Sequence, residues 1–279
     1  MKMTFPIQET IEKRRSVRTY VNKPLSPKDS RDLMAYAESL KNPFEIPVSF
    51  CLLESDNNEK GKKFGTYGVI KGTKTFVGAK APNGEMALEA IGYNFEHLIL
   101  YATHLGLGTC WLAATITRDK FAAALAVQED ELFPAVSSIG YPAEKISLTE
   151  SLMRKGLNAS DRKAWNALFY KDNFETPLTK EDAGKYAVSL EMLRLAPSAS
   201  NKQPWRVVLS GDVYHFFESD HSESGPAVIQ RVDLGIGICH FHLTALENGL
   251  TGEFNRTAPE NISIPKDLQY ICSWIPNNG

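Results

Sequence analysis

The chain has 279 residues, of which 43% are hydrophobic and 23% are charged, and its formal net charge is -2. This composition is ordinary for a soluble globular protein, and the length suits one large domain or two closely packed halves. Because lysine and arginine are scattered through the chain, no basic field would attract nucleic acid or an anionic membrane surface, and we expect neither as a partner.

Secretion, membrane insertion and metal binding are not predicted by this sequence. The N-terminus reaches the charged residues Glu9 and Glu12 too early for a secretory signal. The apolar stretch from about 86 to 114 contains charged and polar side chains, which favours a buried helix over a membrane span. The four cysteines lie far apart and form no C-x-x-C pair, which argues against zinc-finger and thioredoxin-like sites. We therefore expect a soluble, cytoplasmic protein with core cysteines and no metal.

In chain order, the first half predicts two helices, two strands, a long core helix and a final strand. The second helix follows Pro24-Leu25-Ser26, with Ser26 as the expected N-cap and Asp29 three residues later, a pattern that resembles a capping box. The long helix ends at Gly106-Leu107, because glycine readily takes the left-handed conformation that closes a helix. The expected strands are 48–53, 75–77 and 135–142.

The second half repeats this order with different residues. Pro177-Leu178-Thr179 leads into a helix, and Asp182 follows the expected N-cap by three residues. The expected strands are 205–209 and 270–276, on either side of a long helix that ends at Gly249-Leu250.

One constant offset aligns the two long helices. It places His97 on His240 and the closing glycines on each other, which favours a structural role for both histidines. Because order, caps and spacing agree together, an internal duplication explains the chain better than chance does. We expect two copies of one half-unit about a pseudo-twofold axis, with residues 1–155 as the N-terminal half and 156–279 as the C-terminal half.

The polar motifs of the two halves differ. The first half alone carries the run Lys-Arg-Arg-Ser-Val-Arg-Thr-Tyr at 13–20, and the second half alone carries Ala-Pro-Ser-Ala-Ser-Asn-Lys-Gln-Pro-Trp at 196–205. Three arginines and a serine within five residues suit a phosphate, because guanidinium groups bind it bidentately. A solvated basic turn is the simpler alternative. The second run places small and hydrogen-bonding residues between a helix end and a strand, which suits backbone lying flat against a ring system.

Together these motifs resemble the nitroreductase-like FMN-dependent flavoprotein family, as a single-chain fused pseudo-dimer of the TM nitroreductase type. Family members carry Arg-(Arg/His)-Ser-x-(Arg/Lys)-x-(Tyr/Phe) after a first helix and Ala-Pro-Ser-(Ser/Ala)-x-Asn-x-Gln-Pro-Trp at the end of a later one. The runs Gly-Leu-Gly-Thr-Cys-Trp at 106–111 and Gly-Tyr-Pro-Ala-Glu at 140–144 extend the resemblance over nearly the whole chain. It implies an α+β fold, with a mixed, mainly antiparallel sheet flanked by helices and duplicated within the chain.

The resemblance also implies a binding site for flavin mononucleotide (FMN), in which the flavin carries the chemistry and no side chain is catalytic. The implied residues are Arg14, Arg15 and Ser16 at the phosphate and ribityl chain; Arg18 and, by a looser alignment, Lys71 at the pyrimidine; Leu112, Ala113 and Ala114 beside flavin N5; Arg154 and Lys155 closing on the phosphate; and Pro197, Ser198, Ala199 and Asn201 as a wall from the other half. Trp111 and Trp205 either stack on the flavin or fill the core.

The chain departs from the family in carrying each signature once. Family members are normally homodimers with two FMN sites, each built from both subunits. Only one combination of an arginine motif and a serine motif exists here, so we expect one FMN per chain and a dead pseudo-symmetric second site. Both motifs lie on one chain, so a monomer could be competent.

The activity implied by the resemblance is that of an FMN-dependent NAD(P)H oxidoreductase. It would reduce nitroaromatics, quinones or similar small acceptors by ping-pong hydride transfer. The alternatives are an ene-reductase or dehalogenase on the same fold, a non-catalytic FMN-binding or storage protein, and a relic that binds no flavin. The physiological acceptor and the choice between NADH and NADPH stay open.

Overall fold

The structure, a computed structural model, describes residues 4–55, 64–219 and 227–277. Its residue contacts divide the chain into two compact units. The first unit is Lys13–Ala159, and the second unit is Ser160–Gly279 together with Met1–Glu12. The change of unit after residue 159 lies close to the division expected at 155, but residues 1–12, which the sequence placed in the first half, group with the second unit.

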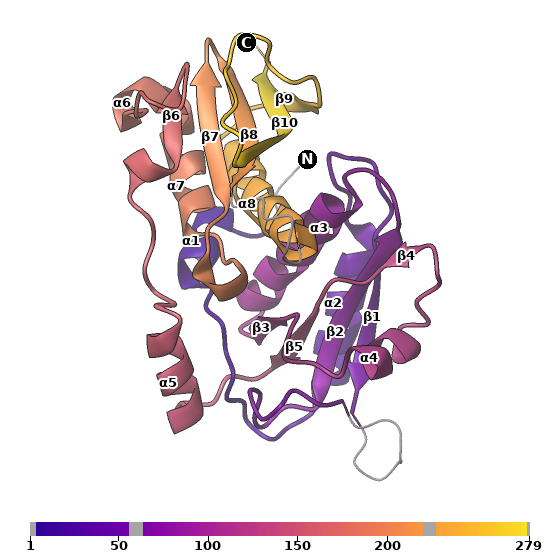
Figure 1. The fold of residues 1–279 in the computed structure, drawn as a ribbon. Coiled ribbons are helices and arrows are strands. Elements are labelled where there is room, and N and C mark those ends of the chain that lie inside the picture. The colour runs from indigo at the N-terminus through magenta and orange to yellow at the C-terminus, as the bar shows by residue number, and fades with distance from the viewer. Residues whose placement is uncertain (1–3, 56–63, 220–226, 278–279) are drawn as a thin grey trace. The chain divides into compact units, whose positions relative to one another are not determined.

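The first unit is built on an antiparallel sheet (Figure 1). Its strands lie in the spatial order β1-β2-β5-β3, and the short β4 pairs with β2. In chain order its elements are α2 (Pro27–Ser39), β1 (Ser49–Glu54), β2 (Thr75–Pro82), α3 (Ala87–His104), β3 (Gly108–Leu112), α4 (Arg118–Ala124), β4 (Glu131–Leu132), β5 (Val136–Gly140) and α5 (Leu148–Gly156).

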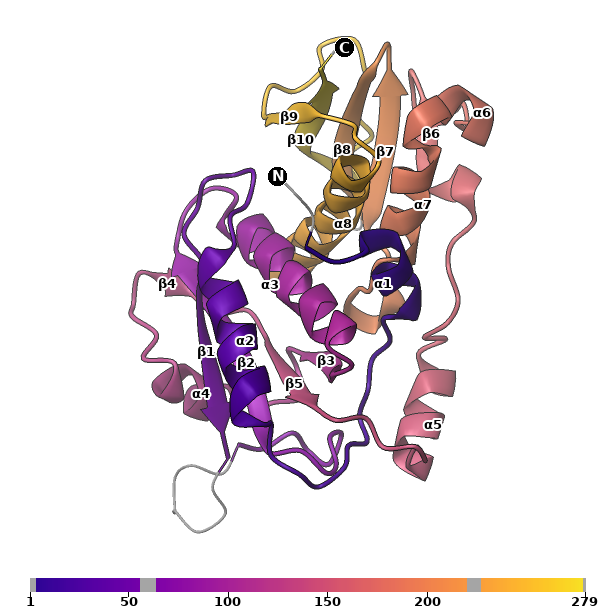
Figure 2. The same ribbon diagram turned by 180° about the vertical axis from the view of Figure 1, so that it is seen from behind.

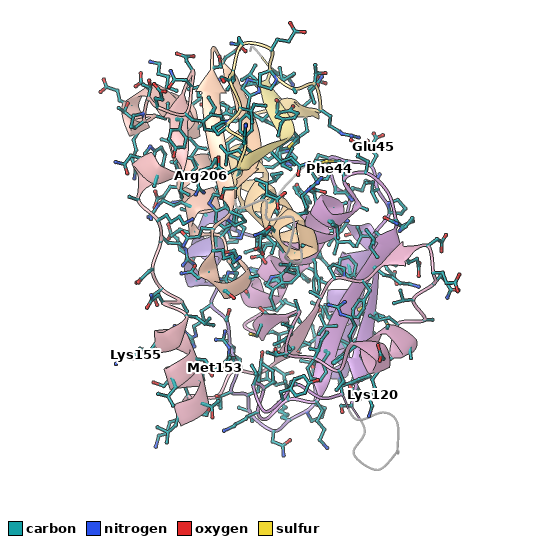
Figure 3. All side chains as sticks on the ribbon, in the orientation of Figure 1. Phe44, Glu45, Lys120, Met153, Lys155 and Arg206 are labelled. Carbon is teal, nitrogen blue, oxygen red and sulfur yellow. The ribbon has the colours of Figure 1, made fainter. Side chains whose placement is uncertain are left out.

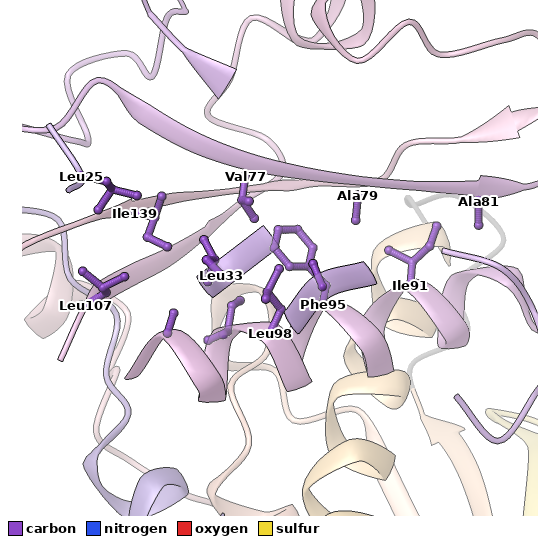
Figure 4. Close-up of a cluster of buried hydrophobic side chains, with 13 residues drawn as sticks. Leu25, Leu33, Val77, Ala79, Ala81, Ile91, Phe95, Leu98, Leu107 and Ile139 are labelled. Carbon is purple, nitrogen blue, oxygen red and sulfur yellow. The ribbon is translucent and has the colours of Figure 1, made fainter. Parts of the chain in front are cut away.

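Strand β2 contributes side chains to apolar cores on both faces of this sheet. Val77 and Ala79 pack with Phe95 of α3 (Figure 4). Phe76 belongs to the other cluster, where its ring lies edge to face against Phe121 of α4 with centroids 5.2 Å apart. Because successive side chains of a strand point to opposite faces, one strand supplies both layers.

The second unit has a five-stranded sheet in the order β6-β7-β8-β10-β9 (Figure 2). All its strand pairs are antiparallel except β6 with β7. Phe241 of α8 packs against Phe216 and Trp274 on one face of this sheet. The elements are α1 (Ile7–Lys13), β6 (Phe169–Lys171), α6 (Lys180–Ala183), α7 (Ala187–Leu195), β7 (Trp205–Ser210), β8 (Val213–Ser219), α8 (Ala227–Glu247), β9 (Gly252–Asn255) and β10 (Leu268–Pro276), with 3-10 turns at Trp165–Ala167, Gly184–Tyr186 and Ala199–Asn201.

The same strand order occurs in both units. β7, β8, β10 and β9 lie side by side in the order of β1, β2, β5 and β3, and the long helix follows the second of these strands in each unit. Gly106 and Gly249 end the long helices with left-handed φ values of +78° and +73°, as a helix-closing glycine should. The α+β fold with an internal duplication is therefore confirmed.

Both expected N-caps are confirmed. The hydroxyl of Ser26 accepts the N–H of Asp29 at 3.0 Å at the start of α2. The hydroxyl of Thr179 accepts the N–H of Asp182 at 3.0 Å at the start of α6. In each pair the aspartate carboxylate also accepts from the capping hydroxyl, so the local sequence alone sets where these helices begin.

The buried helix expected in the apolar stretch 86–114 ends at the predicted Gly106, but the strand that follows it was not predicted. α3 stops at His104, and residues 108–112 form β3. Once Gly106 has closed the helix, the next apolar residues form a strand of the sheet, and Cys110 and Leu112 are buried in its core. Among the described residues, no helix is long and apolar enough to cross a membrane.

Helix α1 belongs to the second unit because a carboxylate of α8 caps it. Glu247 accepts the backbone N–H of Ile7 at 2.6 Å and that of Gln8 at 2.9 Å. These donors lie in the first turn of α1, where N–H groups have no partner within the helix and the helix dipole favours a negative charge. Ile7 and Ile11 of this helix are buried. A contact across 240 residues of sequence thus anchors the N-terminal helix.

Replacing Glu247 with alanine should release α1. Loss of a helix cap costs roughly 0.5–2 kcal/mol, so the free energy of unfolding in urea should fall by that amount. Hydrogen exchange of the amides in α1 should speed up. The control is Glu253→Ala, which removes an exposed glutamate of β9 in the same unit. Equal rates of amide hydrogen exchange in α1 of the two variants would contradict the capping role of Glu247.

The two aligned histidines each join a long helix to its neighbour. His97 of α3 is 2% exposed, and its Nε2 lies 2.8 Å from the Tyr36 hydroxyl of α2. His240 of α8 is 0% exposed, and its Nδ1 lies 3.0 Å from the carbonyl oxygen of Met192 in α7. The duplication therefore keeps a buried histidine at the same helix-helix contact in both units.

The burial of His97 predicts a loss of stability in acid. Burial lowers its pKa to about 4 from an ordinary value of 6.5, so folding favours the neutral ring. This contribution is complete above about pH 6.5 and is lost as the pH falls toward 4, by up to roughly 3 kcal/mol. Urea unfolding at pH 7 and pH 4.5 should show a smaller fall in stability for His97→Asn than for the natural protein. His104→Asn, at an exposed position of α3, should keep the full fall; a full fall in His97→Asn as well would refute this explanation.

Candidate functional site

The arginine motif lies along the edge of the first unit's sheet. The N–H of Val17 donates to the carbonyl oxygen of Thr109 in β3 at 2.8 Å, and Ser16 forms a parallel bridge with Thr109. β3 is the last strand in the order β1-β2-β5-β3, so its outer edge would otherwise present unpaired backbone groups. Residues 16 and 17 cover part of this edge, which fixes the backbone of the motif against the sheet.

The rest of the motif is held by the loops at 71 and 141–143. The N–H of Tyr20 donates to the Lys71 carbonyl oxygen at 2.9 Å, and the N–H of Lys71 donates to the Arg18 carbonyl oxygen at 2.9 Å. The N–H of Ala143 donates to the Thr19 carbonyl oxygen at 3.0 Å. Lys71, which the sequence aligned only loosely, therefore lies beside Arg18 through paired backbone hydrogen bonds.

Two glycines allow these close contacts. A Cβ at Gly108 would lie 2.9 Å from the side chain of Val17. Gly72 has a φ of +88°, and a Cβ there would overlap the carbonyl oxygen of Tyr20. Gly108 thus has a packing role within the Gly-Leu-Gly run, because only a residue without a side chain lets the arginine motif approach β3.

A buried carboxylate joins the arginine motif to α5. Glu150 is 1% exposed, and its Oε2 accepts the N–H of Arg18 at 3.2 Å and the hydroxyl of Thr19 at 2.8 Å. Its Oε1 lies 3.8 Å from Nη1 of Arg154, one helical turn along α5. Ser147 caps α5 by accepting the N–H of Glu150 at 3.2 Å. One side chain therefore places Arg154 close to the arginine motif.

Lys71 reaches the same helix with its side chain. Its Nζ donates to the hydroxyl of Thr149 at 3.1 Å. Three segments that carry cations therefore contact α5: Arg18 through its backbone N–H, Lys71 through its ammonium, and Arg154 from within the helix. Cations on neighbouring segments suit the binding of an anion.

The guanidinium of Arg18 is buried without a hydrogen-bond acceptor for two of its nitrogens. Arg18 is 8% exposed, and neither its Nε nor its Nη1 has a hydrogen-bond partner among the described residues. The Nε of Arg14 also lacks a hydrogen-bond partner among the described residues, but it forms an ion pair at 3.7 Å with the Glu96 carboxylate, which accepts the indole N–H of Trp111 at 2.8 Å. Because an unsatisfied buried charge is costly, the surroundings of Arg18 are those of a site that receives an oxygen-rich anionic group.

Tyr20 and Cys110, two titratable groups near Arg18, supply no negative charge to it. Burial raises the pKa of the Tyr20 hydroxyl well above its usual value, although the nearby Arg18 lowers it. Burial likewise raises the pKa of the Cys110 thiol, which, like the other three cysteines, forms no disulfide bond. Both groups therefore stay neutral near pH 7. The Tyr20 hydroxyl donates to the Val17 carbonyl oxygen at 2.6 Å, so it supports the motif by hydrogen bonding rather than by charge.

The segment expected beside the flavin ring leaves the end of β3. Leu112 is buried in the sheet core, Ala113 is half-buried and Ala114 is exposed. The guanidinium of Arg118 donates to the Ala113 carbonyl oxygen at 3.4 Å and to the Pro134 carbonyl oxygen at 2.9 Å. Arg118 thus fixes the turn after β3, a role that no sequence motif indicated.

The serine motif lies in the second unit, between α7 and β7. Both carboxylate oxygens of Asp233 in α8 lie 3.1 Å from the N–H of Ala199. Burial raises the pKa of Asp233 well above its usual range. Ser200 and Asn201 have left-handed φ values of +51° and +55°, which are uncommon for residues other than glycine and are concentrated at functional sites.

The amide side chains of the serine motif bind the chain of their own unit. The amide nitrogen of Asn201 donates to the Asp161 carbonyl oxygen at 3.0 Å. The amide oxygen of Gln203 accepts the N–H of Lys163 at 2.8 Å. Ser198 accepts the N–H of Gln203 at 2.8 Å. The motif is therefore a rigid loop whose shape is set within the second unit.

The structure places each residue of the expected site in one of two neighbourhoods. Those at the sheet edge of the first unit or on α5 are Arg14, Arg15, Ser16, Arg18, Lys71, Leu112, Ala113, Ala114, Arg154 and Lys155, and those of the serine loop in the second unit are Pro197, Ser198, Ala199 and Asn201. Arg15 and Lys155 are exposed, and Figure 3 labels Lys155 on α5. Trp205 is 0% exposed and belongs to the core. The ring of Trp111 packs against that of Phe95 at a tilted angle, with ring centroids 4.5 Å apart.

Sequence reasoning missed Glu150, Thr19 and Asp233. The pattern Ser147-Leu-Thr-Glu150 is a capping-box signature and could have located the start of α5. It could not have shown that the carboxylate is buried against Arg18. Asp233 lies within the apolar helix α8, where an isolated acidic residue is a signal for a buried partner.

Replacing Glu150 with alanine should detach α5 from the arginine motif. The Arg18 N–H and the Thr19 hydroxyl would lose their acceptor, which costs roughly 1–3 kcal/mol for each buried donor left unsatisfied. Urea unfolding should show this loss, and amide exchange within α5 should speed up. Glu144→Ala, at an exposed position of the same unit, is the control. If Glu150→Ala is as stable as the control, the hydrogen bonds of Glu150 to Arg18 and Thr19 do not stabilise the fold.

The family of the chain follows from comparison with known proteins. The sequence matches the model of the family described as "Putative TM nitroreductase" over residues 6–245. No functionally curated protein matches it.

A solved structure that covers the whole chain shares its fold. A Thermotoga maritima protein described as a "putative nitroreductase" is 20% identical, and the alignment covers 100% of this chain and 97% of that one with a TM-score of 0.62. An FMN-dependent nitroreductase from Clostridium difficile is 18% identical, with 50% of this chain and 88% of that one covered and a TM-score of 0.41. A nitroreductase with bound FMN from Bacteroides fragilis is 19% identical, with coverage of 52% and 92% and a TM-score of 0.41.

Proposed function

The chain belongs to the "Putative TM nitroreductase" family, and on this premise we propose that it is an FMN-dependent oxidoreductase that uses NADH or NADPH to reduce small acceptors such as nitroaromatics or quinones. Family membership supports a general oxidoreductase, and the cofactor, the nicotinamide and the acceptor class are what the proposal adds. The observation that carries it is the buried guanidinium of Arg18, whose Nε and Nη1 have no hydrogen-bond partner in the described part of the chain.

FMN has the chemical groups that this site can accept. Its phosphate is an anion with several acceptor oxygens, which suits the cluster of Arg14, Arg15 and Ser16. Its pyrimidine edge carries carbonyl oxygens, which suit the buried nitrogens of Arg18 and the nearby Lys71. Arg18 would satisfy its guanidinium by binding the cofactor, and its fixed positive charge would stabilise negative charge that develops on the ring.

The remaining residues of the first unit would close the site. Arg154, positioned by Glu150 beside the arginine motif, would reach the phosphate together with Lys155. The backbone of 112–114, fixed by Arg118, would lie beside the ring. Bound FMN would supply the hydride chemistry between the nicotinamide and the acceptor, so the protein needs no nucleophile of its own. Its residues would bind and orient the cofactor.

The serine loop is proposed, from the sequence resemblance, to supply residues 197–201 to the same cofactor. Its fixed shape in the second unit supports this role, because the backbone of Ser200 and Asn201 is held in an uncommon conformation. As each motif occurs once, we propose one FMN per chain and a protein that is competent as a monomer. The four free cysteines suit the reducing cytoplasm in which we place it.

The test is the amount of FMN that the protein holds. The purified protein is saturated with FMN, freed of excess, and denatured, and the released FMN is measured by its visible absorbance. We expect about one FMN per chain, bleaching by NADH or NADPH, and recovery with a nitroaromatic or quinone. Two FMN per chain would contradict the single-site argument. No FMN would overturn the proposed function, and FMN that neither nucleotide reduces would indicate a binding protein instead of an enzyme.

The Arg18→Gln variant identifies the residue that carries the proposal. Loss of a charge-assisted hydrogen bond in a buried site is worth roughly 1.5–3 kcal/mol, so FMN should bind about 10- to 100-fold more weakly. The matched control is Arg31→Gln, at an exposed position of α2, which should bind FMN like the natural protein. Fluorescence quenching of free FMN measures both affinities. Equal affinities would show that Arg18 does not contact the cofactor.

A further inference from the structure

A cavity of about 400 Å³ opens in the second unit, at the start of β7 and the end of β8. Its lining residues are Lys163, Lys202, Pro204, Arg206, Ser219 and Asp267. Figure 3 labels Arg206, which lies on β7 directly after the buried Trp205. Lys202 and Pro204 lie in the 196–205 run, directly after the serine loop, but none of the lining residues is among those assigned to FMN. The volume lies within the range of small-molecule pockets.

Two of its cations are held against one carbonyl oxygen. Nη1 of Arg206 donates to the Gln203 carbonyl oxygen at 3.1 Å, and Nζ of Lys163 donates to the same oxygen at 3.5 Å. Because both nitrogens lie within 3.5 Å of the same oxygen, their positive charges repel each other. The neutral carbonyl group offsets only part of that repulsion. Lys202 adds a third positive charge to the lining, and Asp267 supplies one negative charge. The lining therefore carries a net charge of +2, which matches a dianion.

The framework under these cations is rigid. Gln203 is 3% exposed, has a left-handed φ of +50°, and binds the N–H of Lys163 through its side-chain oxygen at 2.8 Å. The Arg206 guanidinium also donates to the Trp205 carbonyl oxygen at 2.7 Å. Ser219 is fixed by its N–H, which donates to the Pro204 carbonyl oxygen at 2.7 Å. Cations held in place before a ligand arrives lose little freedom on binding.

The partial burial of Arg206 also favours the binding of an anion. Arg206 is half-buried, and desolvation lowers the pKa of its guanidinium, although the nearby Asp267 raises it. A partly desolvated cation gains more from an anionic partner than an exposed one, because water screens the interaction less.

We propose that this cavity binds the phosphate group of a small molecule. A phosphate dianion matches the net charge of the lining, its tetrahedral oxygens can meet an arginine and two lysines together, and the Ser219 hydroxyl can donate a further bond. A carboxylate has one charge and two oxygens, so it matches the same lining less well. The proposal does not rest on the proposed flavin chemistry, since none of the lining residues is assigned to FMN.

The test is calorimetric titration of the FMN-incubated protein with inorganic phosphate, glycerol 3-phosphate and acetate. We expect both phosphates to bind and acetate to bind at least roughly tenfold more weakly, because charge-assisted bonds to phosphate are stronger and more numerous. Glycerol 3-phosphate binding more tightly than inorganic phosphate would identify a phosphate ester as the ligand, and the reverse order would identify free phosphate. Binding of acetate as tight as that of phosphate, or no binding of either phosphate, would overturn the proposal.

Variants with opposite expected signs locate the site. Lys202→Gln removes a cation from the lining and should weaken phosphate binding about five- to tenfold. Asp267→Asn removes the one negative charge and should strengthen it severalfold. The matched control is Lys185→Gln, at an exposed position of the same unit outside the cavity, and it should change nothing. If Lys202→Gln and Lys185→Gln weaken binding equally, phosphate responds to overall charge and the cavity is not the site. The FMN content of each variant is measured separately, so a failure of the flavin proposal is distinguishable from a failure of this one.

Discussion

The burial of the Arg18 guanidinium is the constraint on which the site of the first unit depends. Placing a charge away from water costs several kcal/mol unless a partner offsets it. The backbone of Arg18 is satisfied, with its N–H bound to Glu150 and its carbonyl oxygen bound to Lys71, but two guanidinium nitrogens are not. A ligand that supplies acceptor oxygens would therefore bind the folded state and stabilise it.

The same constraint explains residues that touch no ligand. Gly108 and Gly72 lack a side chain where the arginine motif passes closest to β3 and to the loop at 71. Glu150 is buried because the motif needs an acceptor for its peptide N–H and for the Thr19 hydroxyl. α5 then follows Glu150 and brings Arg154 with it. Packing, capping and electrostatics at this sheet edge thus act together, and a change in any of them would alter the position of the charges.

Because of the duplication, the same arrangement of strands occurs twice in the chain and carries different polar groups in the two units. Both units share a strand order and a histidine at the contact between their long helix and its neighbour. The polar groups diverge, since the first unit carries the arginine motif on its sheet edge and the second carries the serine loop and the basic cavity. A framework fixed by buried apolar contacts tolerates this divergence, because loops and strand ends contribute little to the core.

The sequence by itself determined the long helix of each half with a strand before and after it, the N-caps at Ser26 and Thr179, the closing glycines and the duplication. These follow from local backbone preferences and from the spacing of apolar residues. The sequence also identified Arg14, Arg18 and the serine loop as candidate binding residues, because they belong to short motifs of consecutive polar residues. Only the tertiary structure decided that residues 108–112 form a strand, that Glu247 anchors α1, that Glu150 lies under Arg18, and that Lys163 and Arg206 share one carbonyl oxygen. These are contacts between residues far apart in the chain, and their partners are set by packing rather than by local pattern.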